Sequence, residues 1–463
     1  MTRSKAISIR GQPIMRCPSE LVDMVEDFLN KVISLVRNQE EWRGKSTINL
    51  IASENVMSPL ARALQITDFA HRYAEGEVWH REYQGTRYVD EIEDLCLRLA
   101  NEVFGAKYVD FRPISGALAN LAVFFGLAKP GDSIASLRVP SGGHISFREF
   151  GAAGCRGLSV YDIPFSQEDM NIDVEALAEL VEKVKPRIIT LGGSLFLFPH
   201  PVREVSKIAS SVGAYVHYDA AHVLGLVAGG CFQNPLEEGA DVVTASTHKT
   251  FPGPQGGVVF SNREDVINKI RPAIFPGLVS NHHLHRLPSL AVTLFEFKRF
   301  GREYAFQVVR NAKALGKALY ENGLNVLCPH KGFTESHQIA VDVSEFGGGA
   351  PVAKKLEEAN IIVNKNLLPW DRIEMAETPS GVRIGSQEVT RYGMREPEME
   401  RIAELIVDVI RGKRPLEDIR RDVEKLRREF PKVQYCFDVD EYQEIVEFLS
   451  VALGLRLGGK TAR

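Results

Sequence analysis

Between about residues 90 and 290, helical segments alternate with short β-rich runs. This alternation is typical of a mostly parallel sheet covered by helices, because parallel strands need a crossover segment between them. The β-rich runs are SIASLR, LSVYDIP, RIITLGG, AYVHYD, DVVTAS and GVVFS. In such sheets ligands gather at the carboxyl ends of the strands. Functional residues are therefore expected at those ends.

Further segments lie on either side of this region. Residues 19–43 place apolar side chains at helical spacing, and we expect an amphipathic arm that packs on a neighbour. After a long helical stretch over 290–322, the runs QIAVDV, IIVNKN and VRIG and a helix over 396–410 predict a smaller α/β domain. Beyond residue 415 we expect an amphipathic helix, then a helix from Glu441 that ends in a basic tail.

The expected organisation has three parts. A chain of 463 residues is long enough for two or three domains, each with its own hydrophobic core. The first is a helical arm over residues 1–55, and the second is a large domain over 56–295. The third is a small C-terminal domain with an extra helical tail over 296–463.

The composition argues against several classes of partner. The net charge is only -4, with acidic and basic residues interspersed, so no broad field would hold nucleic acid or an anionic membrane. The N-terminus lacks the apolar core of a signal peptide, and no segment has the roughly 20 apolar residues needed to cross a bilayer. The cysteines are scattered without the short pairs of a zinc site, so we expect no metal. A cytoplasmic location is expected.

The strongest local signal is the segment TASTHKTFPGPQGG over residues 244–257. Here a β-rich run ends in polar residues, a lysine and a loop rich in Gly and Pro. A lysine at the carboxyl end of a strand is well placed for covalent catalysis, and Lys249 is the candidate. Taken alone, such a lysine would more often be a solvated surface group.

Three further residues supply what pyridoxal phosphate requires. Asp219 ends the run AYVHYD, and a carboxylate beside the ring nitrogen would keep the ring protonated and make it an electron sink. Ser115 starts a helical run whose N-terminus could bind phosphate. His144 follows two glycines and could cover the ring. Considered singly, Asp219 could be a loop cap, Ser115 an ordinary helix cap and His144 a structural residue.

With these residues the chain resembles serine hydroxymethyltransferase, a fold-type-I pyridoxal-phosphate family, from about Ile48 to the helix that begins at Glu396. The matching motifs occur in order and are LIASEN, YAEG, PISGALAN, SGGH, YDAAH, STHKTFPGP, VNKN and SGVRIG. The variants LGGSLFLFPHP and FPGLVSNHHLHRLP resemble the archaeal branch. The resemblance implies an α/β fold in which a large domain with a mostly parallel seven-stranded sheet is joined to a smaller C-terminal α/β domain.

The resemblance also implies a set of cofactor contacts. Lys249 would carry pyridoxal phosphate as a Schiff base, Asp219 would pair with the ring nitrogen and His144 would stack on the ring. His222 would lie near the phenolic oxygen. The implied phosphate contacts are Ser115, Gly116, Ser246 and, from a partner subunit, Tyr73.

Substrate contacts follow from the same matching. Arg383 would clamp the substrate carboxylate with help from Ser53 and Tyr83, since a planar guanidinium suits two oxygens at once. Glu75 would face the substrate hydroxyl, and His248 matches a position tied to substrate specificity. Weaker matches to the pterin site are Val139, Gly143, Ile145 and Asn366.

Several residues depart from the family pattern. The chain reads EYQG over residues 82–85 where the family has Tyr-Tyr-Gly-Gly, and it has Gln255 where the family has Arg. Ser280 and Asn281 replace the Gly-Gly pair that the partner subunit lends to the phosphate. A family serine aligns with either Ser194 or Leu195.

The resemblance implies reversible transfer of the serine hydroxymethyl group to a reduced pterin, tetrahydrofolate or an archaeal analogue, giving glycine and a methylene-pterin. Homodimers with shared active sites are expected, because Tyr73, Glu75 and Tyr83 are assigned to the subunit opposite the lysine. An alternative is an aldolase or transaldolase that acts on threonine or α-methylserine without a pterin. A non-catalytic homologue would be expected to lose Lys249 or Asp219. The sequence leaves open the pterin, the preference among these amino acids and the role of the tail.

Overall fold

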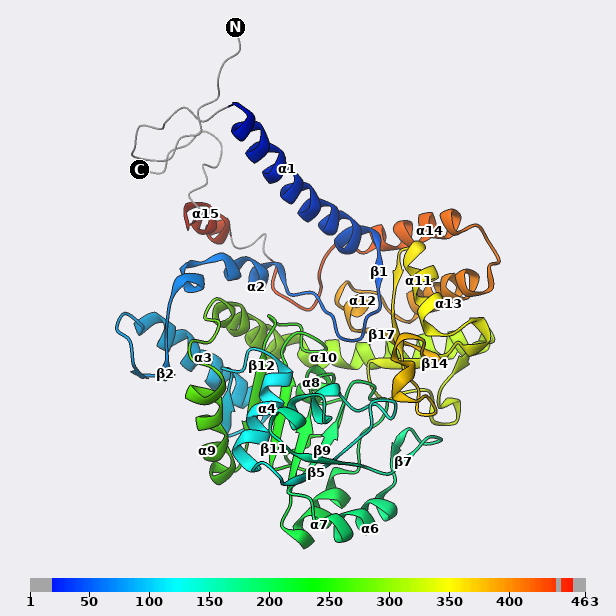
Figure 1. The fold of residues 1–463 in the computed structure, drawn as a ribbon. Coiled ribbons are helices and arrows are strands. Elements are labelled where there is room, and N and C mark those ends of the chain that lie inside the picture. Colours follow the sequence, from blue (N-terminus) through cyan, green and yellow to red (C-terminus); the bar gives the residue numbers. More distant parts are fainter. Residues whose placement is uncertain (1–18, 439–442, 453–463) are drawn as a thin grey trace.

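A seven-stranded sheet forms the centre of the computed structural model, which describes residues 19–438 and 443–452 (Figure 1). The strand order is β4-β12-β11-β10-β9-β5-β6, and only the pairings of β12 with β11 and β4 are antiparallel. All six β-rich runs form strands of this sheet, so the predicted mostly parallel α/β fold is confirmed. The strands are β4 (Tyr108–Asp110), β5 (Ser133–Ser136), β6 (Ser159–Asp162), β9 (Ile188–Gly192), β10 (Tyr215–Asp219), β11 (Val242–Ser246) and β12 (Gly257–Ser261).

Helices cover both faces of this sheet. Successive strand residues point to opposite faces, and accordingly Val242 joins one buried cluster and Val243 the other. One face packs on α3 (Arg87–Phe104), α6 (Val174–Val184), α7 (Val202–Val212), α8 (Leu224–Ala228) and α10 (Arg286–Glu321). The other face packs on α4 (Gly116–Leu127), α5 (Ala152–Cys155) and α9 (Glu264–Pro272).

A smaller antiparallel sheet in the order β13-β14-β17-β16 forms a second core, as the sequence predicted. Its strands are β13 (Asn325–Val326), β14 (Gln338–Asp342), β16 (Asn364–Asn366) and β17 (Gly381–Gly385). The helices around it are α11 (Gly349–Glu358), α12 (Gln387–Arg391), α13 (Glu396–Arg411) and α14 (Leu416–Glu429). β1 (Ile48–Asn49) pairs in parallel with β15 (Ile361–Ile362), which ties the segment after the arm to this part of the chain.

The predicted arm is the helix α1 (Ser19–Glu41), which projects from the body of the molecule in Figure 1. Its apolar side chains, among them Phe28 and Leu35, are exposed in the single chain. The short elements that follow include α2 (Pro59–Ala63) and the hairpin of β2 (Gly76–Glu77) and β3 (His80–Arg81). Two short strands, β7 (Phe165–Ser166) and β8 (Asn171–Ile172), form a separate hairpin.

The C-terminal helix is α15 (Gln443–Ala452). The predicted helix start at Glu441 and the basic tail lie outside the described residues. Within the described ranges, no helix has the length and apolar character needed to span a membrane.

Candidate active site

Lys249 and Asp219 lie at the same edge of the large sheet. β10 ends at Asp219, whose register partner on β11 is Thr244, and Lys249 follows the end of β11 by three residues. The loop after β11 is tied down from both sides. Asn55 Nδ2 donates to the backbone oxygen of Lys249 (2.6 Å), and Thr250 Oγ1 donates to that of His222 (2.7 Å).

The surroundings of Lys249 lower the pKa of its amine. Burial lowers the pKa of Lys249 to about 8, with Asp219 opposing and Arg383 adding to the shift. An amine with such a pKa is partly unprotonated near neutral pH, which a nucleophile or proton acceptor requires. The charges that act on Lys249 therefore come from both sheets, the large one through Asp219 and the small one through Arg383.

Asp219 is buried and held by two donors. Asn120 Nδ2 donates to Oδ2 (2.8 Å), and the backbone N–H of Ala221 donates to Oδ1 (2.8 Å). Asn120 in turn accepts from Thr244 Oγ1 (2.6 Å). No cation pairs with Asp219 in the described part of the chain, although a buried carboxylate is costly without one. The ring nitrogen of pyridoxal phosphate would supply that partner.

The same asparagine reaches His144. Asn120 Nδ2 donates to Ser146 Oγ (3.0 Å), which lies 2.7 Å from His144 Nδ1. Burial lowers the pKa of His144; Asp219 opposes this, whereas Lys249 adds to it. A neutral imidazole held through Nδ1 suits a residue that covers an aromatic ring. The predicted pair Asp219 and His144 is thus brought into one hydrogen-bond network.

The N-terminus of α4 lies against the end of β11. Ser115 caps the helix by accepting from the backbone N–H of Leu118 (3.1 Å). A Cβ on Gly116 would meet Ser246 Oγ at 2.6 Å, so the start of α4 closely approaches the end of β11. Free helix amides beside two hydroxyls form an anion site, and the predicted phosphate residues Ser115, Gly116 and Ser246 meet here.

His222 is buried behind this edge. Its Nδ1 lies 2.7 Å from Gln338 Nε2, which also donates to the backbone oxygen of Ser194 (3.0 Å). Burial holds the pKa of His222 well below its ordinary value, and Lys249 and Arg383 lower it further. The accepting Nδ1 leaves Nε2 as the N–H donor of the neutral ring, which suits the predicted contact with a phenolic oxygen.

Arg383 brings a buried positive charge from β17 of the small sheet. Its Nη1 donates to the backbone oxygen of Ser194 (2.5 Å) and its Nε to Asn364 Oδ1 (3.2 Å). Burial lowers its pKa to about 10. No carboxylate of the described residues pairs with it, so its guanidinium is available to a substrate carboxylate.

His248 and Ser53 line a cavity of about 420 Å³ next to this site. His248 Nδ1 is buried without a hydrogen-bond partner in the described structure. Burial lowers the pKa of His248 to about 4, and Lys249 and Arg286 contribute. Gln255, which replaces the family's arginine, lines the same cavity.

Tyr73, Glu75 and Tyr83 are not brought to Lys249 within the chain. They lie in the segment around the β2–β3 hairpin, where Tyr73 and Tyr83 are 51% and 45% exposed. Their rings meet edge to face, with centroids 5.4 Å apart. The exposure of the two tyrosine rings is what we expect of groups that serve another subunit, and Glu75 is half-buried.

The four weaker predicted residues lie on one loop, a short 3-10 helix (Ile145–Phe147) and a strand. Val139 accepts from the backbone N–H of Gly142 (3.0 Å), and Gly143 donates to Arg138 (2.8 Å), so these residues form the tight turn before His144. Ile145 is exposed. Asn366 ends β16, the strand beside Arg383.

The network contains residues that the sequence reasoning did not assign. Asn120, Ser146 and Gln338 link the predicted residues, and Asn364 and the Ser194 carbonyl orient Arg383. A sequence signal existed for Asn120, because it is a polar residue inside the otherwise apolar run LANLAVFFGL. The Ser194 contact uses a backbone oxygen and has no such signal.

The groups at this edge fit pyridoxal phosphate. They provide a lysine of lowered pKa, a buried carboxylate for the ring nitrogen, a neutral histidine beside it and a helix N-terminus for the phosphate. Arg383 adds a place for a carboxylate.

Comparison with known proteins identifies the family. The family model for serine hydroxymethyltransferase matches residues 25–406. A serine hydroxymethyltransferase of Methanopyrus kandleri is 57% identical over 409 residues, which are 88% of this chain and 95% of that protein. One from Metallosphaera sedula is 53% identical over 420 residues, covering 90% and 97%.

Among solved structures, the L-threonine transaldolase from Pseudomonas fluorescens matches with a TM-score of 0.83. It is 28% identical, and the match covers 94% of this chain and 99% of that one. The chain belongs to the serine hydroxymethyltransferase family and is a pyridoxal-phosphate-dependent one-carbon transferase.

Proposed function

We propose that Lys249 holds pyridoxal phosphate covalently and that the surrounding residues transfer the hydroxymethyl group of serine to a reduced pterin, releasing glycine. The observation that carries this assignment is the combination of Lys249, with its pKa near 8, and the buried charges of Asp219 and Arg383, neither of which forms an ion pair within the part of the chain that the structure describes. Asp219 would face the ring nitrogen, and Ser115, Gly116 and Ser246 would hold the phosphate. His144 and His222 would contact the ring and its oxygen as neutral groups.

Bound pyridoxal phosphate supplies an electron sink that weakens bonds at the substrate α carbon. The chain's own residues decide which bond is broken. Arg383 would hold the serine carboxylate with two N–H groups, and its position fixes the rotation of the α carbon. Ser53, on the wall of the neighbouring cavity, and the partner's Tyr83 would complete this contact.

Proton transfer would involve two groups. Lys249 Nζ can accept and return a proton near neutral pH because its pKa lies near 8. Glu75 would act at the hydroxymethyl oxygen, as a carboxyl group within hydrogen-bond reach of that oxygen can move its proton. His248, whose Nδ1 is unpartnered, would line the substrate side and influence which side chain is accepted.

A homodimer with shared active sites would explain why some candidate residues lie near Lys249 and others lie on the segment around the β2–β3 hairpin. Tyr73 and Tyr83 are exposed, Glu75 between them is half-buried, and α1 presents exposed apolar side chains in the single chain. We propose that each subunit lends the first three residues to its partner. We also propose a division into an arm over 1–55, a cofactor-binding domain over 56–295 and a small domain over 296–463.

The pterin would enter beside the turn that contains Val139 and Gly143, between Ile145 and Asn366. The exposure of Ile145 and the position of Asn366 at the end of β16 support this side. Serine, glycine and a reduced pterin would be the small-molecule partners, in the cytoplasm. The transaldolase alternative has less support, because the neighbour of that name is 28% identical whereas the serine hydroxymethyltransferase of Methanopyrus kandleri is 57% identical.

The test is an assay of purified protein with serine and a panel of reduced pterins, following glycine formation. We expect the amount of glycine formed to rise with the amount of the pterin that the enzyme accepts. We also expect Arg383→Ala to abolish glycine formation. Cleavage of threonine or α-methylserine at a high rate, with no dependence of serine turnover on any pterin, would favour the transaldolase alternative.

A further inference from the structure

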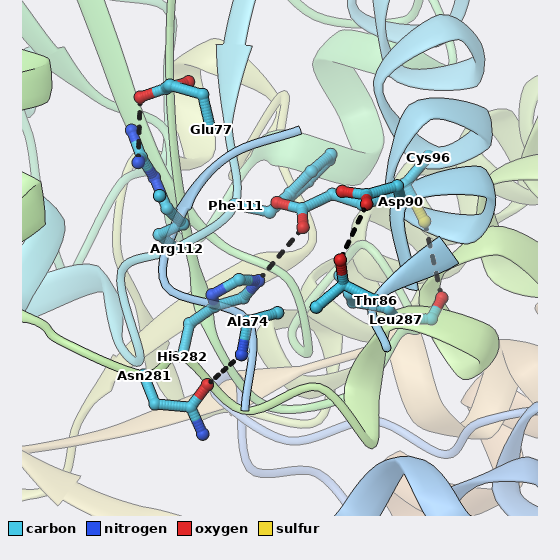
Figure 2. A network of polar contacts seen from close by, with 12 residues as sticks. Ala74, Glu77, Thr86, Asp90, Cys96, Phe111, Arg112, Asn281, His282 and Leu287 are labelled. Carbon is cyan, nitrogen blue, oxygen red and sulfur yellow. Dashed lines mark hydrogen bonds and ion pairs between the residues drawn. The ribbon is translucent and has the colours of Figure 1, made fainter. Parts of the chain in front are cut away.

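The segment that carries Tyr73 and Glu75 has a firmly held backbone, while Tyr73 is exposed and Glu75 is half-buried. Asn281, in the loop before α10, contacts the backbone on both sides of Tyr73. Its Nδ2 donates to the backbone oxygen of Arg72 (3.2 Å), and its Oδ1 accepts from the backbone N–H of Ala74 (3.0 Å). Figure 2 shows the second of these contacts. One side chain thus fixes the peptide groups on both sides of Tyr73.

Arg81, on the second strand of the hairpin, brackets Glu75 in the same way. Its Nη1 donates to the backbone oxygens of Ala74 (3.1 Å) and Gly76 (2.9 Å). The backbone oxygen of Glu75 itself accepts from the N–H of Glu82 (3.1 Å). The peptide groups around Glu75 are therefore fixed by hydrogen bonds to their backbone oxygens.

Buried acids hold Arg81 in this position. Its side chain is only 2% exposed, and it contacts Asp90 Oδ1 (2.8 Å) and Glu93 Oε2 (2.5 Å) on α3. Burial alone would raise the pKa of Glu93, but His282 and Arg81 hold it at about 2. Thr86 Oγ1 donates to Asp90 (3.1 Å), as Figure 2 shows. The guanidinium is thus anchored on one side and directs its remaining N–H groups at the hairpin.

The turn itself depends on Gly76, which has φ +100° and would place a Cβ 2.6 Å from the backbone oxygen of His80. Only glycine fits, because both the conformation and the close approach exclude a side chain. This turn brings Arg81 opposite Gly76 in the hairpin register. Arg81 can therefore reach the two oxygens that flank Glu75.

We propose that Asn281 and Arg81 are positioning residues, which hold the 72–76 backbone so that Tyr73 and Glu75 are presented to the partner subunit's active site. The inference rests on the proposed function, since it assumes that these two side chains act across the dimer. It also gives a role to Asn281 at the place where the family has a glycine. In this chain the side-chain amide of Asn281 holds residues 72–76, which are called the lent segment because they would serve the partner's active site.

The test uses mixed dimers. Lys249→Ala chains and Glu75→Ala chains are each expected to be inactive, and mixing them creates one site with an intact lysine and an intact lent segment. Asn281→Ala is then added to one chain or the other. In the Lys249→Ala chain it loosens the segment that serves the working site, and we expect kcat to fall about tenfold or more. In the Glu75→Ala chain it loosens a segment that already lacks its carboxyl, so activity should equal that of the parent pair.

Two further variants separate positioning from other roles. Asn281→Asp keeps the oxygen that accepts from Ala74, so it should retain more activity than Asn281→Ala. A direct contact of Asn281 with phosphate would give the opposite order, because the new charge would be repelled. Arg81→Lys keeps the charge beside the buried acids but lacks the guanidinium group, which donates several hydrogen bonds at once. It should therefore lower kcat with little change in melting temperature.

The matched control is Asn262→Ala. Asn262 is exposed and its Oδ1 accepts from the backbone N–H of Lys107 (2.9 Å), the same chemistry as at Ala74, and we expect no effect in either chain. No recovery from the parent pair, in chains shown to exchange, would overturn the shared site and this inference with it. Recovery with equal activity in the two Asn281→Ala arrangements would overturn the positioning role alone.

Discussion

Replacement of Asn120 by alanine removes the hydrogen-bond centre of the site. Asn120 is 1% exposed and makes three side-chain hydrogen bonds, to Asp219, Ser146 and Thr244. The bond to the carboxylate contributes about 1.5–3 kcal/mol and each neutral bond about 1 kcal/mol. We therefore expect Asn120→Ala to lower the free energy of unfolding of the cofactor-free protein by about 4 kcal/mol.

The same change should weaken cofactor binding. Asp219 would keep only the donor at Ala221, so its carboxylate would be held less firmly toward the ring nitrogen. If the less firmly oriented carboxylate lowers the binding free energy by about 1.4 kcal/mol, the Kd for pyridoxal phosphate becomes tenfold larger. Urea unfolding of the cofactor-free protein and titration with the cofactor measure the two effects separately.

Asn311→Ala is the matched control for this prediction. Asn311 is fully buried and also makes three side-chain hydrogen bonds, to Thr390, Met394 and Gln307, remote from the site. It should destabilise the fold by a comparable amount and leave the Kd for the cofactor unchanged. The reasoning would be refuted if the two variants lost cofactor affinity equally, or if Asn120→Ala lost less than about 1 kcal/mol of stability.

Three further predictions follow from the charges at the site. The pKa of Lys249 near 8 means that the free-amine fraction rises about tenfold between pH 7 and 9, so the rate at which the cofactor-free protein captures pyridoxal phosphate should rise similarly and then level off. A rate that still climbed tenfold per pH unit above 9 would indicate an ordinary lysine. Arg383→Lys should lower kcat/KM for serine about ten- to hundredfold, since one N–H group replaces a fork, and should not affect an analogue that lacks the carboxylate. Glu82 is exposed, and Arg81 and Arg87 pair with other acids, so Glu82→Gln should improve binding of polyglutamylated tetrahydrofolate at low salt and not at high salt. Equal affinities at low salt would make Glu82 a surface residue without influence on the pterin.

The strands and the ends that carry Lys249 and Asp219 could be predicted from sequence. Short β-rich runs with polar endings, such as AYVHYD and DVVTAS, mark both the sheet and the edge where ligands bind. The helix N-terminus at Ser115 was equally visible, because a capping residue precedes an apolar run. Each of these signals depends only on residues that are close together in the sequence, so the sequence alone is enough to detect it.

The contacts that unite the site could not be predicted in this way. Asn120 lies on α4 and meets Asp219 only because the α4 helix packs over the end of β10, a long-range relation that no short pattern encodes. Arg383 is oriented by the Ser194 backbone oxygen, which every residue type possesses. The lack of an acidic partner for Arg383 among the described residues is likewise a property of the packed structure.

The most direct test of the account is to identify the lysine that binds the cofactor. Purified protein loaded with pyridoxal phosphate would be reduced with borohydride, digested and mapped by mass spectrometry. The account predicts a single labelled peptide that contains Lys249, because its lowered pKa and the adjacent phosphate and carboxylate sites distinguish it from surface lysines. A label on a different lysine, or persistence of the reducible adduct in Lys249→Ala, would contradict the central assignment.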